Sequence, residues 1–355
     1  MPTDARVVVL PVETAQLRID EVRLPDPGPY QVVVKQFASG VCHSQLHQMH
    51  RPRTAPVVLG HESTGVVLAK GSKVNHVKEG DRVMVTWVPR DREHMDHPLS
   101  AAEIELADGS KAVSQNVFTW ANTTIADEQF VVKMPEDVPT DVTAIIGCAV
   151  MTGAGAVYHT AGVKAKQSVA IFGVGGVGLS AVAAAAVVGA EPIIAVDLAE
   201  EKLEFARRFG ATIGVNASQG NPVAKVRELT NGGPDFAFDC IGVKQTMEQI
   251  LPTVRSGEFG GASGGTAVLV GVPMTTAELN MADLLIGEKT LKGSIGGSCR
   301  PDRDFPMFIR WFKEGQLDLN ALVTQRYTLD QINEATTALQ NGQIAGRSIL
   351  QMDQP

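Results

Sequence analysis

Short runs rich in valine alternate with polar turns along the first 150 residues. The runs are 6–10, 31–36 and 82–85, and the turn-forming clusters are 25–29 and 78–81. Apolar runs of this length, separated by proline, glycine and aspartate, are typical of strands in a β-barrel or β-sandwich. The segment 90–122 is more polar and less regular, and we expect a long surface excursion there.

From residue 168 onward, strand-like and helix-like segments alternate. The expected strands are 168–172, 192–196, 236–240 and 267–270, and the expected helices include 177–188 and 200–209. This alternation predicts a parallel, doubly wound sheet. Two further helix-like stretches, 304–313 and 329–341, follow, and we expect the last segments to return to the first domain. The predicted domains are therefore 1–150 with 295–355, and 151–294.

The uncharged stretch 167–190 is long enough to span a bilayer, but five glycines interrupt it. A strand, a glycine turn and an alanine-rich helix explain it better, so we predict no membrane span. The net charge is −8, which disfavours nucleic acid as a partner. The first ten residues lack a basic region followed by a long apolar core, so we expect no signal peptide. The four dispersed cysteines suit a reducing compartment, and we expect a cytoplasmic protein.

A glycine-rich motif lies where the expected strand 168–172 ends and a helix begins. Its members are Gly173, Gly175, Gly176, Val177 and Gly178. A G-x-G-x-x-G turn lets backbone approach a pyrophosphate at the positive end of a helix. Asp197 ends the next expected strand, where a carboxylate can bind both ribose hydroxyls and repel a 2′-phosphate. The motif predicts a dinucleotide site that prefers NAD to NADP, and an ordinary glycine turn is the alternative.

Two cysteines and a histidine of the first domain form a candidate ligand set. Cys42, His61 and Cys148 would supply two thiolates and an imidazole, with a fourth position left for water or substrate. This set is typical of a catalytic zinc site. Their long-range spacing does not show that they converge, and each could instead be a buried structural residue.

These motifs together resemble one family. The segments Cys42-His43-Ser44, Gly60-His61-Glu62 and Gly147-Cys148, the glycine motif and Asp197 occur in the order seen in zinc-dependent medium-chain alcohol dehydrogenases, and so do the later segments 239–242 and 346–349. The resemblance covers nearly the whole chain. It implies a GroES-like β-rich catalytic domain, a Rossmann coenzyme domain and an active site in the cleft between them.

The resemblance also implies roles for single residues. Cys42, His61 and Cys148 would bind zinc, with Glu62 as a nearby carboxylate that can approach the metal. Ser44 and His47 would relay a proton through the coenzyme ribose. The remaining coenzyme contacts would be His43, Thr152, Lys202 and Arg347, and the substrate pocket would be lined by Thr86, Trp87 and Ala126.

The chain departs from the family pattern in two places. Gln45 stands where the family usually has an aspartate that accepts a hydrogen bond from the zinc-binding histidine, which puts the electrophilicity and retention of the metal in doubt. No cysteine lies between Cys42 and Cys148, although many members bind a structural zinc there through four cysteines. We read the segment 93–97 as a solvated polar loop and predict one catalytic zinc per chain and no structural zinc.

The implied reaction is reversible hydride transfer between a primary or secondary alcohol and NAD, giving an aldehyde or ketone. Trp87 and the small Ala126 favour a roomy apolar pocket for an aromatic or terpenoid-like alcohol. The alternatives are a zinc-free quinone or enoyl reductase on the same fold, a nicotinoprotein that keeps NAD bound, and a nucleotide-binding sensor without chemistry. A homodimer or homotetramer is expected, with 289–295 as the candidate edge strand.

Overall fold

The computed structural model describes residues 3–352, and the chain divides into two compact units. The first comprises Met1–Cys148, Arg300–Arg310 and Leu319–Pro355, and the second comprises Ala149–Cys299 and Trp311–Asp318. The outermost ends of the predicted domains, 1–2 and 353–355, lie outside the described residues. The segments 149–150, 295–299 and 311–318, predicted in the first domain, are grouped with the second unit. Trp311 packs edge-on against Tyr158 of that unit, with ring centroids 5.6 Å apart.

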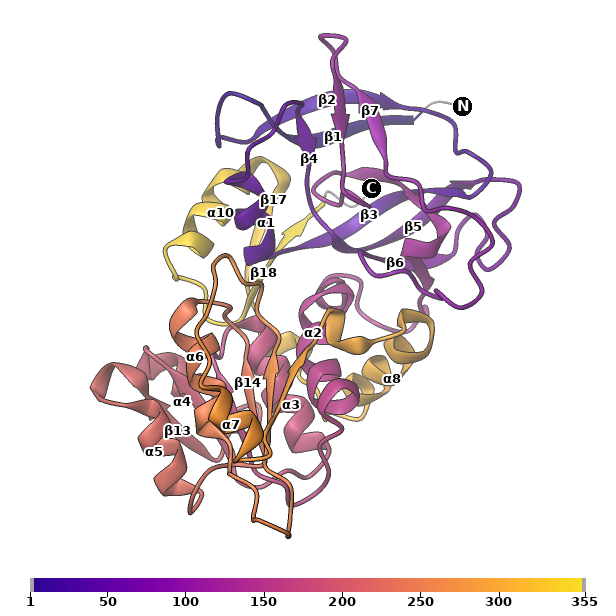
Figure 1. Ribbon diagram of the computed structural model, residues 1–355. Helices are drawn as coiled ribbons and strands as arrows, with labels where there is room; N and C mark the ends of the chain where they lie inside the picture. The colour runs from indigo at the N-terminus through magenta and orange to yellow at the C-terminus, as the bar shows by residue number, and fades with distance from the viewer. Residues whose placement is uncertain (1–2, 353–355) are drawn as a thin grey trace. The chain divides into compact units, whose positions relative to one another are not determined.

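Two sheets build the first unit (Figure 1). The strands of the five-stranded sheet are, in spatial order, β2 (Arg18–Leu24), β1 (Thr3–Leu10), β4 (Val57–Val58), β8 (Lys111–Val113) and β7 (Glu103–Glu105). The main path of the seven-stranded sheet is β10 (Val131–Lys133), β6 (Arg82–Thr86), β5 (Glu62–Lys70), β3 (Gln31–Val41), β18 (Arg347–Gln351) and β17 (Val323–Thr328), and β9 (Thr123–Asp127) pairs with β3.

Side chains on the two faces of β3 pack in two different hydrophobic clusters of the first unit. Val32 and Val34 pack in a cluster of valines from β5, β6 and β10, whereas Val33 packs in a cluster with Val7 and Val9 of β1. Successive side chains of a strand point to opposite faces, so β3 needs apolar residues on both. The valine-rich runs predicted as strands are therefore strands with two buried faces.

The prediction of a surface excursion over 90–122 is wrong from residue 103 onward. This segment contains β7 and β8, and Phe118 and Trp120 are fully buried. The Trp120 indole Nε1 donates a hydrogen bond to the Gly40 carbonyl over 3.0 Å. The two strands have only three residues each, which is too short for a period to show in the sequence.

The C-terminal part of the chain returns to the first unit. β18 pairs antiparallel with β3, and Ile349 lies opposite Gly40. The helices around these strands are α1 (His43–Met49), α9 (Leu319–Leu322) and α10 (Ile332–Gln340), while α8 (Pro301–Lys313) contributes to both units. The predicted helices at 304–313 and 329–341 are thus present, the second as a 3-10 turn (Leu329–Gln331) followed by α10.

The second unit is a six-stranded parallel sheet with helices. The spatial order is β13 (Ile213–Asn216), β12 (Ile193–Asp197), β11 (Val169–Phe172), β14 (Phe236–Asp239), β15 (Thr266–Leu269) and β16 (Thr290–Gly293). Its helices are α2 (Ala149–Gly155), α3 (Gly176–Val187), α4 (Glu200–Arg207), α5 (Pro222–Leu229), α6 (Lys244–Thr253) and α7 (Met281–Leu285). The β-rich unit and the doubly wound parallel sheet confirm the predicted fold class.

Apolar side chains of α5 and α6 pack on one face of the parallel sheet. Val226, Ile250 and Leu251 join Phe172 and Val196 in one buried cluster. Strands of a parallel sheet are buried on both faces, which is why they read as continuous apolar runs. Among the helices of the described residues, none is both long enough and apolar enough to cross a bilayer.

Candidate metal centre and coenzyme site

Four residues of the first unit converge on one point. Cys42, His61, Glu62 and Cys148 each present a ligand atom, and these atoms all lie within 4.8 Å of one another. Cys42 precedes α1, His61 and Glu62 lie where β5 begins, and Cys148 follows the 3-10 helix Val142–Gly147. The fold thus brings together residues 19 and 87 positions apart in the sequence, as 61 − 42 and 148 − 61 show.

Hydrogen bonds from two side-chain hydroxyls to backbone carbonyls hold the segments that carry the cluster. The Thr86 hydroxyl donates to the carbonyl of Gly147 over 2.7 Å, which holds the segment leading to Cys148. The Ser39 hydroxyl donates to the carbonyl of Glu62 over 2.9 Å. Both side chains are fully buried, so these hydrogen bonds are not exposed to competing water.

The cluster is chemically ready for a soft metal ion. Hydrogen bonding to Cys148 is the largest influence on Cys42, and together with the positive charge of Arg347 it lowers the pKa of the Cys42 thiol well below its usual range despite burial. The thiolate is the form of cysteine that binds metals. The Ser44 hydroxyl also donates to Cys42 Sγ over 3.3 Å.

His61 has one nitrogen committed and one free. Its Nδ1 lies 2.6 Å from Nε2 of the buried Gln45, whereas its Nε2 is shielded from solvent and has no hydrogen-bond partner among the described atoms. A buried imidazole nitrogen without a partner is costly unless a ligand occupies it. The orphaned nitrogen and the two cysteines therefore fit a zinc ion.

Glu62 and Arg347 form a buried ion pair beside the cluster. The side chains are 0% and 5% exposed, and the guanidinium Nη2 donates to Glu62 Oε1. The resemblance implied a coenzyme contact for Arg347. The structure gives it a partner within the first unit instead, and its coenzyme role stays a prediction.

The expected relay residues lie on α1. His43 is exposed at the first position of the helix, while Ser44 and His47 are half-buried. Burial is the largest influence on His47 and lowers its pKa below the ordinary value. The thiolate of Cys42 raises this pKa, whereas the charges of Arg51 and His50 lower it. His47 is therefore neutral at pH 7 and able to accept a proton.

Two of the three expected pocket residues are core residues. Thr86 is fully buried and its hydroxyl is bound to Gly147. Ala126 is 1% exposed and packs in the valine cluster around β3. Both lie in strands whose side chains fill the interior of the unit, and their assignment to a substrate pocket stays a prediction.

Trp87 is the third expected pocket residue. Its ring lies edge-on to His61, with centroids 6.3 Å apart, and its buried indole Nε1 has no hydrogen-bond partner among the described atoms. The Asn116 amide donates to the Trp87 carbonyl over 3.3 Å. Sequence reasoning missed Asn116, which lies in an irregular segment without a motif.

The glycine motif of the second unit forms a strand–turn–helix. Gly173 has a φ of 85°, and a Cβ on Gly178 would lie 1.8 Å from the Gly173 carbonyl oxygen, whereas a Cβ on Gly175 would meet nothing within 4 Å. Gly176 and Val177 are the first residues of α3. The turn thus leaves open space at the N-terminus of a 12-residue helix, which suits a pyrophosphate.

Asp197 ends β12 beside this turn. Its Oδ2 accepts a hydrogen bond from Val174 N over 3.0 Å, and its Oδ1 accepts one from Leu198 N over 2.8 Å. Lys202 lies half-buried on α4, and the buried Thr152 hydroxyl on α2 has no partner among the described atoms. The turn, the carboxylate and the helix fit a dinucleotide.

The segment 93–97 is not a solvated loop throughout. The His97 ring stacks on Tyr30 with centroids 3.8 Å apart, and its two nitrogens lie 3.0 Å from Asp96 and 3.1 Å from Asp127. Burial opposes the charge of His97, but the hydrogen bonds to Asp96 and Asp127 outweigh it and raise its pKa. The His97 ring, paired with two carboxylates, joins the segment 93–97 to the fully buried Asp127.

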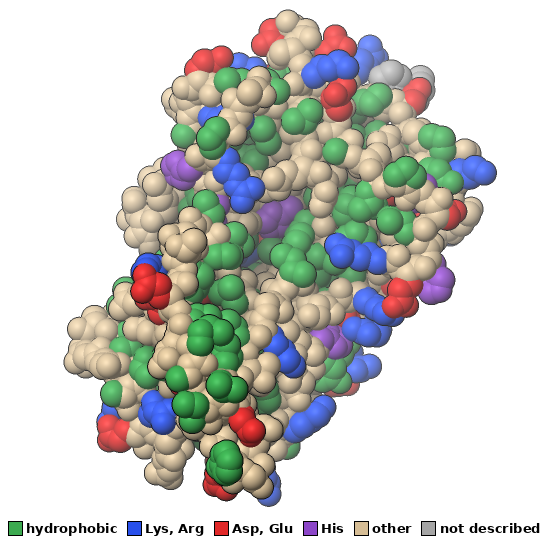
Figure 2. All heavy atoms as spheres, in the orientation of Figure 1, with side chains coloured by type: hydrophobic (Ala, Val, Ile, Leu, Met, Phe, Trp, Pro, Cys, Tyr) green, Lys and Arg blue, Asp and Glu red, His purple; other side chains and the backbone are tan. Residues whose placement is uncertain are grey.

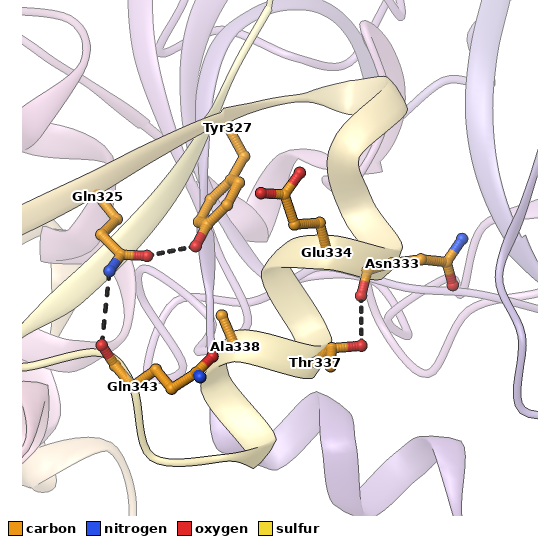
Figure 3. Close-up of a pocket in the computed structure, with 7 residues that line it drawn as sticks. All are labelled: Gln325, Tyr327, Asn333, Glu334, Thr337, Ala338 and Gln343. Atoms are coloured by element: carbon orange, nitrogen blue, oxygen red, sulfur yellow. Dashed lines mark hydrogen bonds between the residues drawn. The ribbon is translucent and has the colours of Figure 1, made fainter.

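A separate hollow of about 650 Å³ lies beside α10 and β17 (Figure 3). Its polar groups largely satisfy one another: the Tyr327 hydroxyl donates to Gln325, and the Thr337 hydroxyl donates to the Asn333 carbonyl over 2.7 Å. Its seven described lining residues include neither histidine nor cysteine. This hollow therefore has no set of groups for metal or nucleophilic chemistry.

Comparison with known proteins settles the family. The family model described as "Alcohol dehydrogenase GroES-like domain" matches residues 28–136, and the one described as "Zinc-binding dehydrogenase" matches residues 176–314. An alcohol dehydrogenase class-3 of Cereibacter sphaeroides is 31% identical over 360 residues, covering 92% of this chain and 94% of the relative. The chain belongs to the zinc-dependent medium-chain dehydrogenase family.

Two solved structures of this family share the whole fold. An alcohol dehydrogenase zinc-binding domain protein from Burkholderia ambifaria superposes with a TM-score of 0.90 at 29% identity and covers 100% of both chains. Benzyl alcohol dehydrogenase from Acinetobacter calcoaceticus gives a TM-score of 0.88 at 30% identity and covers 99% of this chain and 100% of its own. The chain is an alcohol dehydrogenase-type oxidoreductase.

Proposed function

We propose that the protein is a zinc- and NAD-dependent alcohol dehydrogenase that interconverts a primary or secondary alcohol and its aldehyde or ketone. The observation that carries the proposal is the convergence of Cys42, His61 and Cys148 with a partnerless Nε2 on His61. Two thiolates and an imidazole leave a fourth position for water or substrate, as in catalytic zinc sites. We propose one such zinc per chain and no structural zinc.

The metal and the coenzyme divide the chemistry. Bound zinc supplies a Lewis acid that makes an alcohol proton easier to lose, and NAD supplies the hydride acceptor. Cys42, His61 and Cys148 would hold the metal, and Arg347 neutralises Glu62 beside this cluster. Gly175, the N-terminus of α3 and Asp197 would hold the dinucleotide, and the carboxylate of Asp197 would favour NAD over NADP.

Residues of α1 handle the proton that the alcohol loses. Ser44 donates to Cys42 Sγ, so its hydroxyl lies at the edge of the metal cluster. His47 is three residues further along the same helix, and its lowered pKa keeps it in the neutral form that accepts a proton. We propose that Ser44 and His47 are the two protein groups of a relay that carries this proton to solvent.

The proposed substrate is a bulky apolar alcohol, aromatic or terpenoid-like. Trp87 presents a broad apolar ring edge-on to His61, close to the position where the reacting alcohol would bind. The structural relative from Acinetobacter calcoaceticus is a benzyl alcohol dehydrogenase, which supports an aromatic substrate. Trp87 is the residue on which the proposed specificity rests, with Thr86 and Ala126 as further proposed pocket residues.

The second unit offers a surface for self-association. β16 is an edge strand, and the exposed residues near it include Met281 (64%), Leu285 (81%), Ile286 (79%) and Ile295 (75%). Figure 2 shows hydrophobic side chains gathered on this face of the second unit. Exposed apolar patches and unpaired edges mark association sites, so we propose a homodimer, or a homotetramer built from it, that forms through β16. Among the described residues the four cysteines form no disulfide, which suits the reducing cytoplasm that we propose as the location.

Alcohol-dependent reduction of the coenzyme tests the proposal. Purified protein is incubated with benzyl alcohol and either NAD or NADP, and absorbance of the reduced coenzyme is followed. We expect turnover with NAD, its loss in Cys42→Ala and His61→Ala, and a higher kcat/KM for benzyl alcohol than for ethanol. Reduction of a quinone or enoyl substrate without zinc would instead identify the reductase of the same fold, and coenzyme that survives desalting would identify a nicotinoprotein.

A further inference from the structure

Gln45 touches two members of the metal cluster with opposite ends of its amide. Its side chain is fully buried, its Oε1 lies 3.1 Å from the backbone nitrogen of Cys42, and its Nε2 lies 2.6 Å from His61 Nδ1. The inference below rests on the proposed zinc site. It concerns how this one amide changes the affinity of the site for the metal.

The backbone of Cys42 fixes which way the amide points. A backbone N–H only donates, so the atom facing it has to be the amide oxygen. The other end of the amide, an NH₂ group that also only donates, then faces His61 Nδ1. Nδ1 therefore accepts a hydrogen bond, and a neutral His61 carries its proton on Nε2.

A metal ligand needs the opposite tautomer. When Nε2 binds a metal ion, Nδ1 carries the proton and needs an acceptor. With the amide oriented as it is, Nδ1–H would face the NH₂ of Gln45. Rotating the amide would satisfy His61, but the NH₂ would then face the N–H of Cys42. Either orientation leaves a buried donor without an acceptor, which is unfavourable.

We propose that Gln45 is a positioning residue that favours the metal-free form of the site and thereby makes its zinc weakly held and exchangeable. A carboxylate at the same position would accept hydrogen bonds from Cys42 N–H and His61 Nδ1–H at once, since both of its oxygens are acceptors. The amide supplies one acceptor for two donors. Gln45 thus makes the helix-capping bond to Cys42 compete with metal binding by His61.

Zinc affinity of three proteins tests this inference. Apo wild type, Gln45→Glu and Gln45→Met compete for Zn²⁺ with a chromophoric chelator of known affinity. We expect Gln45→Glu to bind zinc at least about tenfold more tightly than wild type, because both donors then have acceptors. We expect the zinc affinity of Gln45→Met to stay within about threefold of wild type, because methionine removes the hydrogen bonds of Gln45 from the metal-free and the zinc-bound site alike. If the hydrogen bond between Gln45 and His61 instead supported zinc binding, this variant would lose about 10–100-fold in affinity.

The tautomer of His61 gives a second readout that needs no metal and no activity. Nitrogen-15 spectra of apo protein with labelled histidine identify which ring nitrogen carries the proton, and a His61→Ala spectrum assigns the signal. We expect an Nε2–H imidazole in apo wild type and an Nδ1–H imidazole in apo Gln45→Glu. This readout on wild type alone keeps the inference testable if Gln45→Glu does not fold.

The outcomes separate the inference from the proposed function. Equal zinc affinity of wild type and Gln45→Glu, a loss of tenfold or more in Gln45→Met, or an Nδ1–H imidazole in apo wild type would each overturn the role of Gln45 while leaving the zinc site intact. Failure of all three proteins to bind zinc would overturn the proposed zinc site and the inference together.

Discussion

Alanine at two glycines of one turn is predicted to have opposite consequences. Gly178→Ala would place a methyl 1.8 Å from the Gly173 carbonyl oxygen, whereas Gly175→Ala would place one in open space at an ordinary φ of −75°. The first contact is backbone against methyl, so the turn or α3 has to shift. The second variant changes little in the free protein.

The magnitudes follow from these contacts. Overpacking of this kind destabilises by about 1–3 kcal/mol, and about 2 kcal/mol corresponds to a fall in Tm of roughly 4–8 °C for a unit of this size. At Gly175, the entropy lost from the unfolded chain by adding a methyl is offset by the poorer capping of alanine, so we expect a change within about 0.5 kcal/mol. The methyl would, however, occupy the space proposed for the pyrophosphate.

Thermal unfolding and NADH fluorescence titration measure the two effects separately. We expect Gly178→Ala to lower Tm and Gly175→Ala to keep Tm while weakening NADH binding at least about tenfold, the equivalent of a lost contact of about 1.4 kcal/mol. Equal Tm values for both variants would refute the steric reasoning. Wild-type NADH affinity in Gly175→Ala would refute the placement of the pyrophosphate at this turn.

Three further predictions concern His97, His47 and the edge strand. Because the pKa of His97 is raised, its ion pairs stabilise the fold fully below the ordinary value of 6.5, and this stabilisation is lost as pH rises through the folded pKa. His97→Gln should therefore lower the free energy of unfolding, measured by urea denaturation, by about 1–3 kcal/mol at pH 6 and by less at pH 9. An equal loss at both pH values would contradict a charged His97 at pH 6. Because the pKa of His47 is lowered, alcohol oxidation should fall only as pH drops below 6.5; His47→Asn should slow turnover at least about tenfold, whereas the exposed control His50→Asn should not, and equal rates in the two would exclude His47 from the relay. Leu285→Asp should give a monomer by light scattering while Leu68→Asp, 39% exposed on the first unit, should not, and an unchanged mass in Leu285→Asp would place the interface elsewhere.

The doubly wound sheet was predictable because its signals are local. Parallel strands buried on both faces give continuous apolar runs, and β11, β12, β14 and β15 each lie within a residue or two of the predicted segments. The turn at Gly173 is set by contacts between neighbours in sequence. The same holds for Asp197, since it lies at the end of the next strand.

The first unit was harder to predict because its contacts join distant segments. Phe118 and Trp120 are buried by strands far away in the sequence, so a polar neighbourhood hid their role. The same cause hid the burial of Thr86 and Ala126, whose strands point them into the interior. We predicted His97 to lie in a solvated loop because its partner Asp127 is 30 positions further along the chain. Contacts between segments so far apart in the sequence leave no pattern in the residues next to each partner.

Zinc content and ligand sphere of freshly purified protein test the central claim most directly. Elemental analysis with X-ray absorption at the zinc edge should give about one zinc per chain, with two sulfur neighbours at about 2.3 Å and a nitrogen at about 2.0–2.1 Å. Cys148→Ser should reduce the sulfur neighbours to one. A protein without zinc that added Zn²⁺ cannot load, or zinc without sulfur neighbours, would contradict the assignment of Cys42, His61 and Cys148 as the metal site.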